Sequence, residues 1–262
     1  MVLPLVLTAV AAAAPIGDPI AEAAYAIQAG RLDQARAMIA KQIAGGARGP
    51  IIERLLADLA FASGKHAEAF SRYESLTVNG DAVLLERAAI SAVKSGALDR
   101  AKPLADQAVA APGASWRAWN VRGVAADLRN DFAVADESYR KALSATPDQP
   151  DVLNNLGWSH LLRGEWQQAA AALEKAVAAK GATQRARNNL ELAKAAIASD
   201  LPRRAAGESD ADFAARLNDA GVAAQIRGER QRAIAAFAQA IATRDSWYDR
   251  AARNLKRAES NQ

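Results

Sequence analysis

A period of 34 residues in the middle of the chain limits the possible folds more than any other feature of the sequence. Between residues 117 and 179, two successive segments can be superimposed so that large and small residues recur at the same relative positions. Gly123 and Tyr139 stand at positions 8 and 24 of the first segment, and Gly157 and Leu173 stand there in the second. A period of this length indicates an array of supersecondary units, each packing mainly on its neighbours.

The order of side chains in the first segment resembles a known family. Its key residues are Trp119, Gly123, Ala126, Ala135, Tyr139, Ala142 and Pro147. This order of large, small, aromatic and proline residues resembles the tetratricopeptide repeat, a helix–turn–helix unit of 34 residues. The resemblance implies an all-α fold, a right-handed superhelical solenoid of such units. Abundant alanine and sparse β-branched residues favour helix independently.

Residues that tolerate a left-handed backbone mark the turn expected between the two helices of each unit. They are Gly30, Gly64, Gly96, Asn130, Gly164 and Gly228, with spacings of 34, 32, 34, 34 and 64. Glycine and asparagine suit such turns because they accept positive φ at a helix C-terminus. The long last spacing predicts an interruption of the array.

These signals divide the chain into five segments. We predict a signal peptide or apolar leader at 1–16, five tandem repeats at 17–182, a lone helix with a Pro/Gly break at 183–208, a sixth repeat at 209–245 and a capping helix at 246–258. The apolar stretch at 2–16 has the length of a signal-peptide core and is too short to span a bilayer comfortably. No Lys or Arg precedes it, and an uncleaved anchor or a cytosolic first helix are the alternatives.

The sequence contains no pattern typical of an enzyme. Cysteine is absent, and the two histidines, His66 and His160, belong to no metal-binding pair. His160 occupies position 11, which faces the core of a repeat. We interpret Asp127 and Asp136 as solvated surface residues. We therefore expect no catalytic residue, metal or cofactor, and the absence of long basic runs argues against a nucleic-acid partner.

A binding surface is the stronger functional hypothesis. In stacked repeats of this family, positions 2, 5, 6, 9 and 12 of the first helices tend to face a concave groove. Asparagine recurs at position 5 of four such helices, and its amide both donates and accepts hydrogen bonds, as holding the backbone of an extended peptide requires. The predicted partner-binding residues are Arg117, Asn120, Asn154, Asn155, Trp158, Arg185, Asn188, Asn189 and Asn218.

An alternative interpretation of the same residues is purely structural. The asparagines would then cap or bridge neighbouring helices, and Trp158 would pack between units. The residues differ from the carboxylate-clamp type of tetratricopeptide repeat, because position 5 lacks lysine. Recognition of an acidic chain terminus is therefore not expected, although Arg117 and Arg185 can pair with an acidic side chain.

The function implied is a non-enzymatic scaffold that binds a protein or peptide. The fifth unit, followed by the NNLELA helix and the Leu201-Pro202 break, resembles the repeat component of tight-adherence (Flp-type) pilus assembly, usually an outer-membrane lipoprotein; this chain has no cysteine for a lipid. We therefore predict a role in bacterial envelope or pilus assembly, in the periplasm or exported, with no stable membrane span unless the leader is uncleaved. A cytosolic regulatory or assembly factor and an accessory subunit of an enzyme complex are the alternatives.

Overall fold

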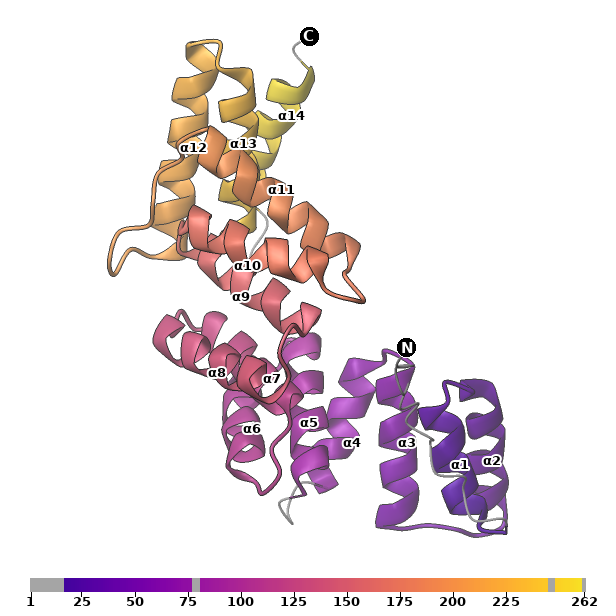
Figure 1. The fold of residues 1–262 in the computed structure, drawn as a ribbon. Coiled ribbons are helices and arrows are strands. Elements are labelled where there is room, and N and C mark those ends of the chain that lie inside the picture. The colour runs from indigo at the N-terminus through magenta and orange to yellow at the C-terminus, as the bar shows by residue number, and fades with distance from the viewer. Residues whose placement is uncertain (1–16, 77–80, 245–247, 261–262) are drawn as a thin grey trace, which may run out of the picture. The chain divides into compact units, whose positions relative to one another are not determined.

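The structure, a computed structural model, describes residues 17–76, 81–244 and 248–260 (Figure 1). Within these ranges the chain forms fourteen α-helices and no strand, which confirms the predicted all-α fold. The leader predicted at 1–16 lies outside the described residues, as do Ser246 and Trp247 at the start of the predicted capping helix.

The helices form two compact units that divide between Ala114 and Ser115. The first unit contains α1 (Pro19–Gln28), α2 (Leu32–Ala44), α3 (Pro50–Ala62), α4 (His66–Leu76), α5 (Ala82–Ser95) and α6 (Leu98–Ala110). The second contains α7 (Trp116–Asp127), α8 (Phe132–Ala145), α9 (Pro150–Leu162), α10 (Trp166–Ala178), α11 (Gln184–Ala198), α12 (Asp210–Ile226), α13 (Arg230–Ala242) and α14 (Asp249–Ser260). The repeat pattern does not predict this division.

Local signals set where the helices begin and turn. Asp81, Ser115 and Ser209 accept hydrogen bonds from backbone N–H groups in the first turns of α5, α7 and α12, which stabilises those ends. All six predicted turn residues have positive φ, between 59° at Asn130 and 81° at Gly96. Each pair of helices can therefore reverse direction through a short turn, as the sequence pattern predicts.

Within a pair, the two helices approach closely because a small residue faces a large one. Positions 8 and 24 meet at Gly123 with Tyr139, and again at Gly221 with Phe237. A Cβ atom on Gly123 would lie 2.5 Å from Cε1 of Tyr139, far inside normal contact distance. The Tyr139 ring is completely buried against α7, so the repeat period arises from this packing of a ring on bare backbone.

In the first unit, ion pairs connect the first helices of neighbouring repeats. The Arg87 guanidinium on α5 donates to the Asp58 carboxylate on α3 at 2.5 Å, and the Tyr73 hydroxyl donates to the same carboxylate at 2.5 Å. Arg54 on α3 donates to Asp81, the N-cap residue of α5, at 3.0 Å. Charged side chains thus hold α3 beside α5.

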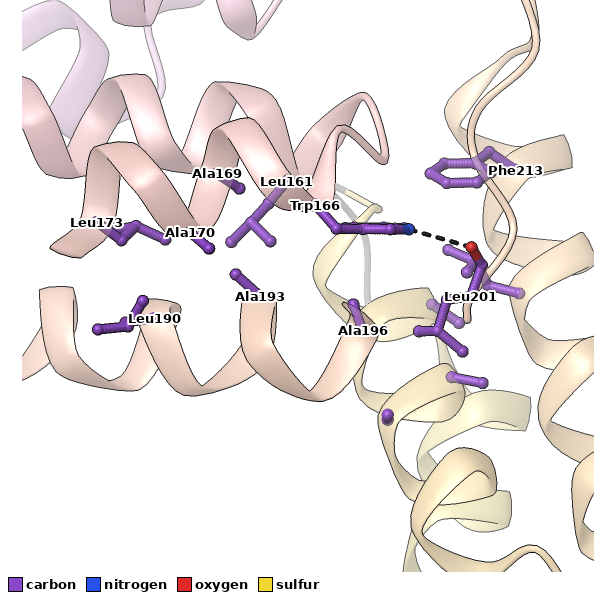
Figure 2. Packing of buried hydrophobic residues seen from close by; sticks show 14 of the residues in the cluster. Leu161, Trp166, Ala169, Ala170, Leu173, Leu190, Ala193, Ala196, Leu201 and Phe213 are labelled. Atoms are coloured by element: carbon purple, nitrogen blue, oxygen red, sulfur yellow. Dashed lines mark hydrogen bonds between the residues drawn. The ribbon is translucent and has the colours of Figure 1, made fainter. Parts of the chain in front are cut away.

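In the second unit, the segment after α11 folds back onto the start of α10. The Trp166 indole N–H donates to the carbonyl oxygen of Leu201 at 3.1 Å, and both side chains are buried in one apolar cluster with Phe213 (Figure 2). The Gln239 amide of α13 donates to the carbonyl oxygen of Leu161 at 3.1 Å. The pair α12–α13 is thereby fixed against the turn between α9 and α10, and α11 packs against α10 and α13.

The turn at Gly164 explains how the returning segment approaches so closely. A Cβ atom there would lie 3.0 Å from the Arg203 Cα, and its φ of 69° also favours glycine. Beside it, the buried Arg204 guanidinium donates to the carbonyl oxygen of Leu162 at 3.3 Å and to the Asp210 carboxylate at 2.5 Å. These bonds place the N-terminus of α12 next to the C-terminus of α9.

The contact between Gly123 and Tyr139 gives a testable prediction. Gly123→Ala should lower the free energy of unfolding by about 1–3 kcal/mol, because the added methyl group overpacks the α7–α8 contact. Gly45→Ala is the matched control, since its Cβ would lie 3.4 Å from the nearest atom. Urea unfolding followed by circular dichroism measures both, and equal stability of the two variants would contradict the packing argument.

Candidate functional site

Four asparagine side chains form one hydrogen-bonded series across three helices. The Asn189 amide on α11 donates to the Asn154 oxygen at 3.0 Å, Asn154 donates to Asn155 at 3.3 Å, and Asn155 donates to Asn120 on α7 at 3.0 Å. Each amide group has two N–H donors, so the three asparagines that donate within the series, Asn154, Asn155 and Asn189, each retain one for another acceptor. The series therefore bridges neighbouring helices, as the structural interpretation requires, while keeping donors that a peptide backbone can use.

We call Asn120, Asn154, Asn155 and Asn189 the amide series. Two other predicted residues, Asn188 and Asn218, lie apart from it. Asn188 is exposed and accepts a hydrogen bond from Gln184 at 2.9 Å. Asn218 on α12 is buried and accepts one from Asn254 on α14 at 2.9 Å. An asparagine pair therefore also joins α12 to α14, separately from the amide series.

The other predicted residues have different surroundings. The Arg117 guanidinium is exposed and lies 4.4 Å from the ring centre of Trp116. Trp158 is half-buried and packs against the apolar cluster around Trp166. Arg185 is exposed, and within the described residues no hydrogen bond or ion pair joins it to another side chain.

A pocket of about 480 Å³ brings several of these residues together in the second unit. Five predicted residues line it, namely Asn154, Asn155, Trp158, Arg185 and Asn189. The remaining lining residues are Val124, Asp127, Leu128, Asn130, Tyr139, Leu162, Asp210, Ala242, Thr243 and Arg244. The pocket therefore lies between α7, α9 and α11 on one side and the ends of α12 and α13 on the other.

Asp127 contributes a buried carboxylate to this pocket, so our interpretation of it as a solvated surface residue is wrong. Only 7% of the residue is exposed. The Tyr139 hydroxyl donates to one carboxylate oxygen at 2.7 Å, and the Ser159 hydroxyl donates to the other at 2.6 Å. Burial raises the pKa of Asp127 to about 6, although these hydrogen bonds and the positive charge of Arg163 act in the opposite direction.

Behind Asp127, Arg163 is already paired with another carboxylate. Its guanidinium donates two hydrogen bonds of 2.8 Å to Asp136, and it also lies 3.5 Å from Glu165. Glu165 contacts His160 Nδ1 at 2.6 Å, and this histidine is half-buried. Since Arg163 divides its charge between two other carboxylates, the Asp127 carboxylate has no ion-pair partner of its own among the described residues.

Sequence reasoning missed two parts of the pocket. The position of Asp127, 12 residues into the repeat, places it on the same face as the asparagines, but its burial follows from the Tyr139 and Ser159 hydroxyls on two other helices. Asp210 and Arg244 reach the pocket only because α12 and α13 fold back onto α9 and α10. The repeat pattern is interrupted at the break, and no local signal predicts that contact.

Within the described ranges, no group of three or more His, Cys, Asp and Glu residues is arranged to hold a metal ion. Among the described helices, none is both long and apolar enough to cross a membrane.

Comparison with known proteins identifies the repeat. A model of the tetratricopeptide repeat family matches residues 87–150 and 129–184. Residues 87–184 belong to the tetratricopeptide repeat family. Together with the stacked helix pairs of both units, this match makes the fold an all-α tetratricopeptide-repeat solenoid. No curated protein sequence matches the chain.

Solved structures with tetratricopeptide-like folds resemble nearly the whole chain. The Cut9–Hcn1 complex of the APC/C has a TM-score of 0.58 and 14% identity over 93% of this chain, which spans only 49% of the length of that one. PilW, described as a type IV pilus biogenesis factor, has a TM-score of 0.53 and 14% identity, covering 92% of this chain and 97% of its own. PilF of Pseudomonas aeruginosa has a TM-score of 0.51 and 14% identity, covering 93% and 96%. At these identities the similarity shows the fold alone.

The buried carboxylate makes stability depend on pH. An unfolded aspartate has a pKa of about 3.9, whereas the folded pKa of Asp127 is about 6, so the folded state binds the proton more tightly. The contribution of Asp127 to the free energy of unfolding therefore falls as the pH rises from about 4 to 6. Asp127→Asn should raise that free energy on the order of 2 kcal/mol at pH 8 and change it little at pH 4.

Urea unfolding at both pH values measures this effect. Asp219→Asn is the control, because it removes the same charge from an exposed position in the middle of α12. Stabilisation of both variants by the same amount, or of Asp127→Asn equally at both pH values, would contradict a buried, uncompensated carboxylate.

Proposed function

We propose that this protein is a non-enzymatic scaffold that binds a polypeptide partner in the pocket between α7, α9 and α11. The observation that carries the proposal is the amide series beside that pocket. Asn154, Asn155 and Asn189 are oriented by their mutual hydrogen bonds and line the pocket with Trp158 and Arg185. Amides that are fixed in this way can bind the peptide groups of an extended chain at little cost in side-chain entropy.

The other predicted residues have supporting roles in this proposal. Asn120 accepts from Asn155 and so orients the amide series, and the exposed Arg117 is available to an acidic side chain of a partner that extends beyond the pocket. Asn188 and Asn218 lie outside the lining of the pocket. We therefore assign the central contacts to Asn154, Asn155, Trp158 and Asn189, with Arg185 at the N-terminus of α11.

We further propose that the scaffold acts in bacterial envelope or pilus assembly. Two observations support this choice over a cytosolic role. Two of the similar folds, PilW and PilF, are described by names that refer to pili. In addition, residues 2–16 have the composition of a signal-peptide core. An exported scaffold would meet its polypeptide partner outside the cytoplasm.

Photo-crosslinking tests the binding site directly. A photoreactive phenylalanine analogue at position 158 should crosslink to a polypeptide in the cells of origin, because Trp158 lines the pocket. The same analogue at Lys141, an exposed position on α8, should give no such product. In the Asn154→Ala/Asn189→Ala background, crosslinking at 158 should fall at least tenfold at a temperature at which circular dichroism shows the variant to be fully folded. Equal crosslinking at the two positions would contradict the proposed site.

The proposed location has its own test. Protein purified from the envelope fraction of the cells of origin should have a new N-terminus near residues 13–15, since export through a cleaved signal removes the apolar stretch. Mass spectrometry of the intact chain measures this. A chain that retains Met1 and fractionates with cytosolic markers would contradict export and favour a cytosolic assembly factor.

A further inference from the structure

The pocket combines a carboxylate that lacks a positively charged partner with aromatic and amide side chains in its lining. Asp127 is 7% exposed, and both of its oxygens accept hydrogen bonds only from neutral hydroxyls, those of Tyr139 and Ser159. The nearby Arg163 donates both of its short ion-pair bonds to Asp136 instead. A buried carboxylate without a cation is costly, so the site favours a ligand that brings one positive charge to Asp127.

The other lining residues can contact the aliphatic carbons and the N–H groups of a basic side chain. Trp158 offers an aromatic surface to aliphatic carbons or to the cation itself. The oxygen of Asn189 accepts no hydrogen bond from another member of the amide series, so it is available to an N–H donor. No basic side chain of the described residues forms an ion pair with Asp127.

Two arginines also line the pocket and restrict the number of positive charges that a ligand can carry. Arg185 lies at the N-terminal end of α11, and Arg244 follows the C-terminal end of α13, where its guanidinium lies 5.1 Å from the ring centre of Tyr248. Neither is among the charges that act most strongly on Asp127, which are those of Arg163 and Asp136. They therefore leave the carboxylate uncompensated, yet they repel a second positive charge on the ligand.

We propose that the pocket recognises a single basic side chain, lysine or arginine, whose cationic group pairs with the Asp127 carboxylate while its methylene groups lie along Trp158. This inference rests on the proposed polypeptide-binding function and specifies the partner. The partner segment carries one basic residue between neutral or acidic residues, because Arg185 and Arg244 disfavour a polybasic stretch.

Short peptides test this specificity without knowledge of the partner. The probe is an acetylated, amidated pentapeptide with one central lysine between alanines. In nuclear magnetic resonance titrations of the full chain, it should shift the Trp158 indole N–H and the Asp127 carboxyl carbon to saturation. The same peptide with norleucine in place of lysine should bind at least tenfold more weakly, as should a peptide with three consecutive lysines.

Variants assign the effect to the carboxylate. Asp127→Asn should weaken binding of the lysine peptide at least tenfold, and the folded control Asp219→Asn should leave it unchanged. Lowering the pH from 7.5 to 5 should weaken binding to the unmodified protein by roughly tenfold, because most of Asp127, with its pKa of about 6, becomes protonated. The Asp127→Asn variant should show no such pH dependence, since it has no carboxyl group to titrate at this position.

The outcomes separate this inference from the proposed function. Equal binding of the lysine and norleucine peptides, or unchanged lysine binding by Asp127→Asn, overturns the basic-residue inference even if position 158 crosslinks to a partner. Saturable, Asp127-dependent lysine binding supports the inference even if no crosslinked partner is found, in which case the polypeptide-binding function fails separately.

Discussion

Close approach of two helices within each pair is the constraint on which the rest of the structure depends. Where glycine at position 8 faces a large side chain at position 24, as Gly123 faces Tyr139, the side chain of the second helix lies directly on the backbone of the first. This packing buries Tyr139 completely. It also brings the tyrosine hydroxyl to Asp127, one turn further along the same face of α7, at 2.7 Å. The contact that builds the repeat therefore also shapes the pocket.

Neighbouring repeats are joined by polar side chains whose chemistry differs between the two units. In the first unit, Arg87 and Asp58 form an ion pair between α3 and α5. In the second, neutral amides connect α7, α9 and α11 through Asn120, Asn155, Asn154 and Asn189. Amides are less costly to desolvate than ions and keep additional donors, so the second unit can join its helices and still offer hydrogen bonds to a ligand. The same side chains can thus serve stability and binding.

The pair α12–α13 packs back against the turn between α9 and α10 and the start of α10, and this contact changes the surface formed by α7, α9 and α11. Because of this contact, a pocket forms between α7, α9 and α11 on one side and the ends of α12 and α13 on the other. The contact also brings Asp210 and Arg244 into the lining. The contact depends on Gly164, on the buried Arg204 and on the Trp166–Leu201 hydrogen bond. Asp127 and its neutral hydroxyl partners then lie in a partly enclosed site, where an uncompensated charge has the strongest effect.

The sequence by itself determined the helix pairs, their turns and the face on which the asparagines lie, because these depend on local period and on residues such as Asn130 and Gly164 that accept positive φ. It also placed Asn154, Asn155, Trp158, Arg185 and Asn189, five lining residues, on that face. Only the tertiary structure decided that Asn218 joins α14 instead, that Asp127 is buried and that α13 closes the pocket. These features depend on contacts between residues up to 78 positions apart, which no local pattern encodes.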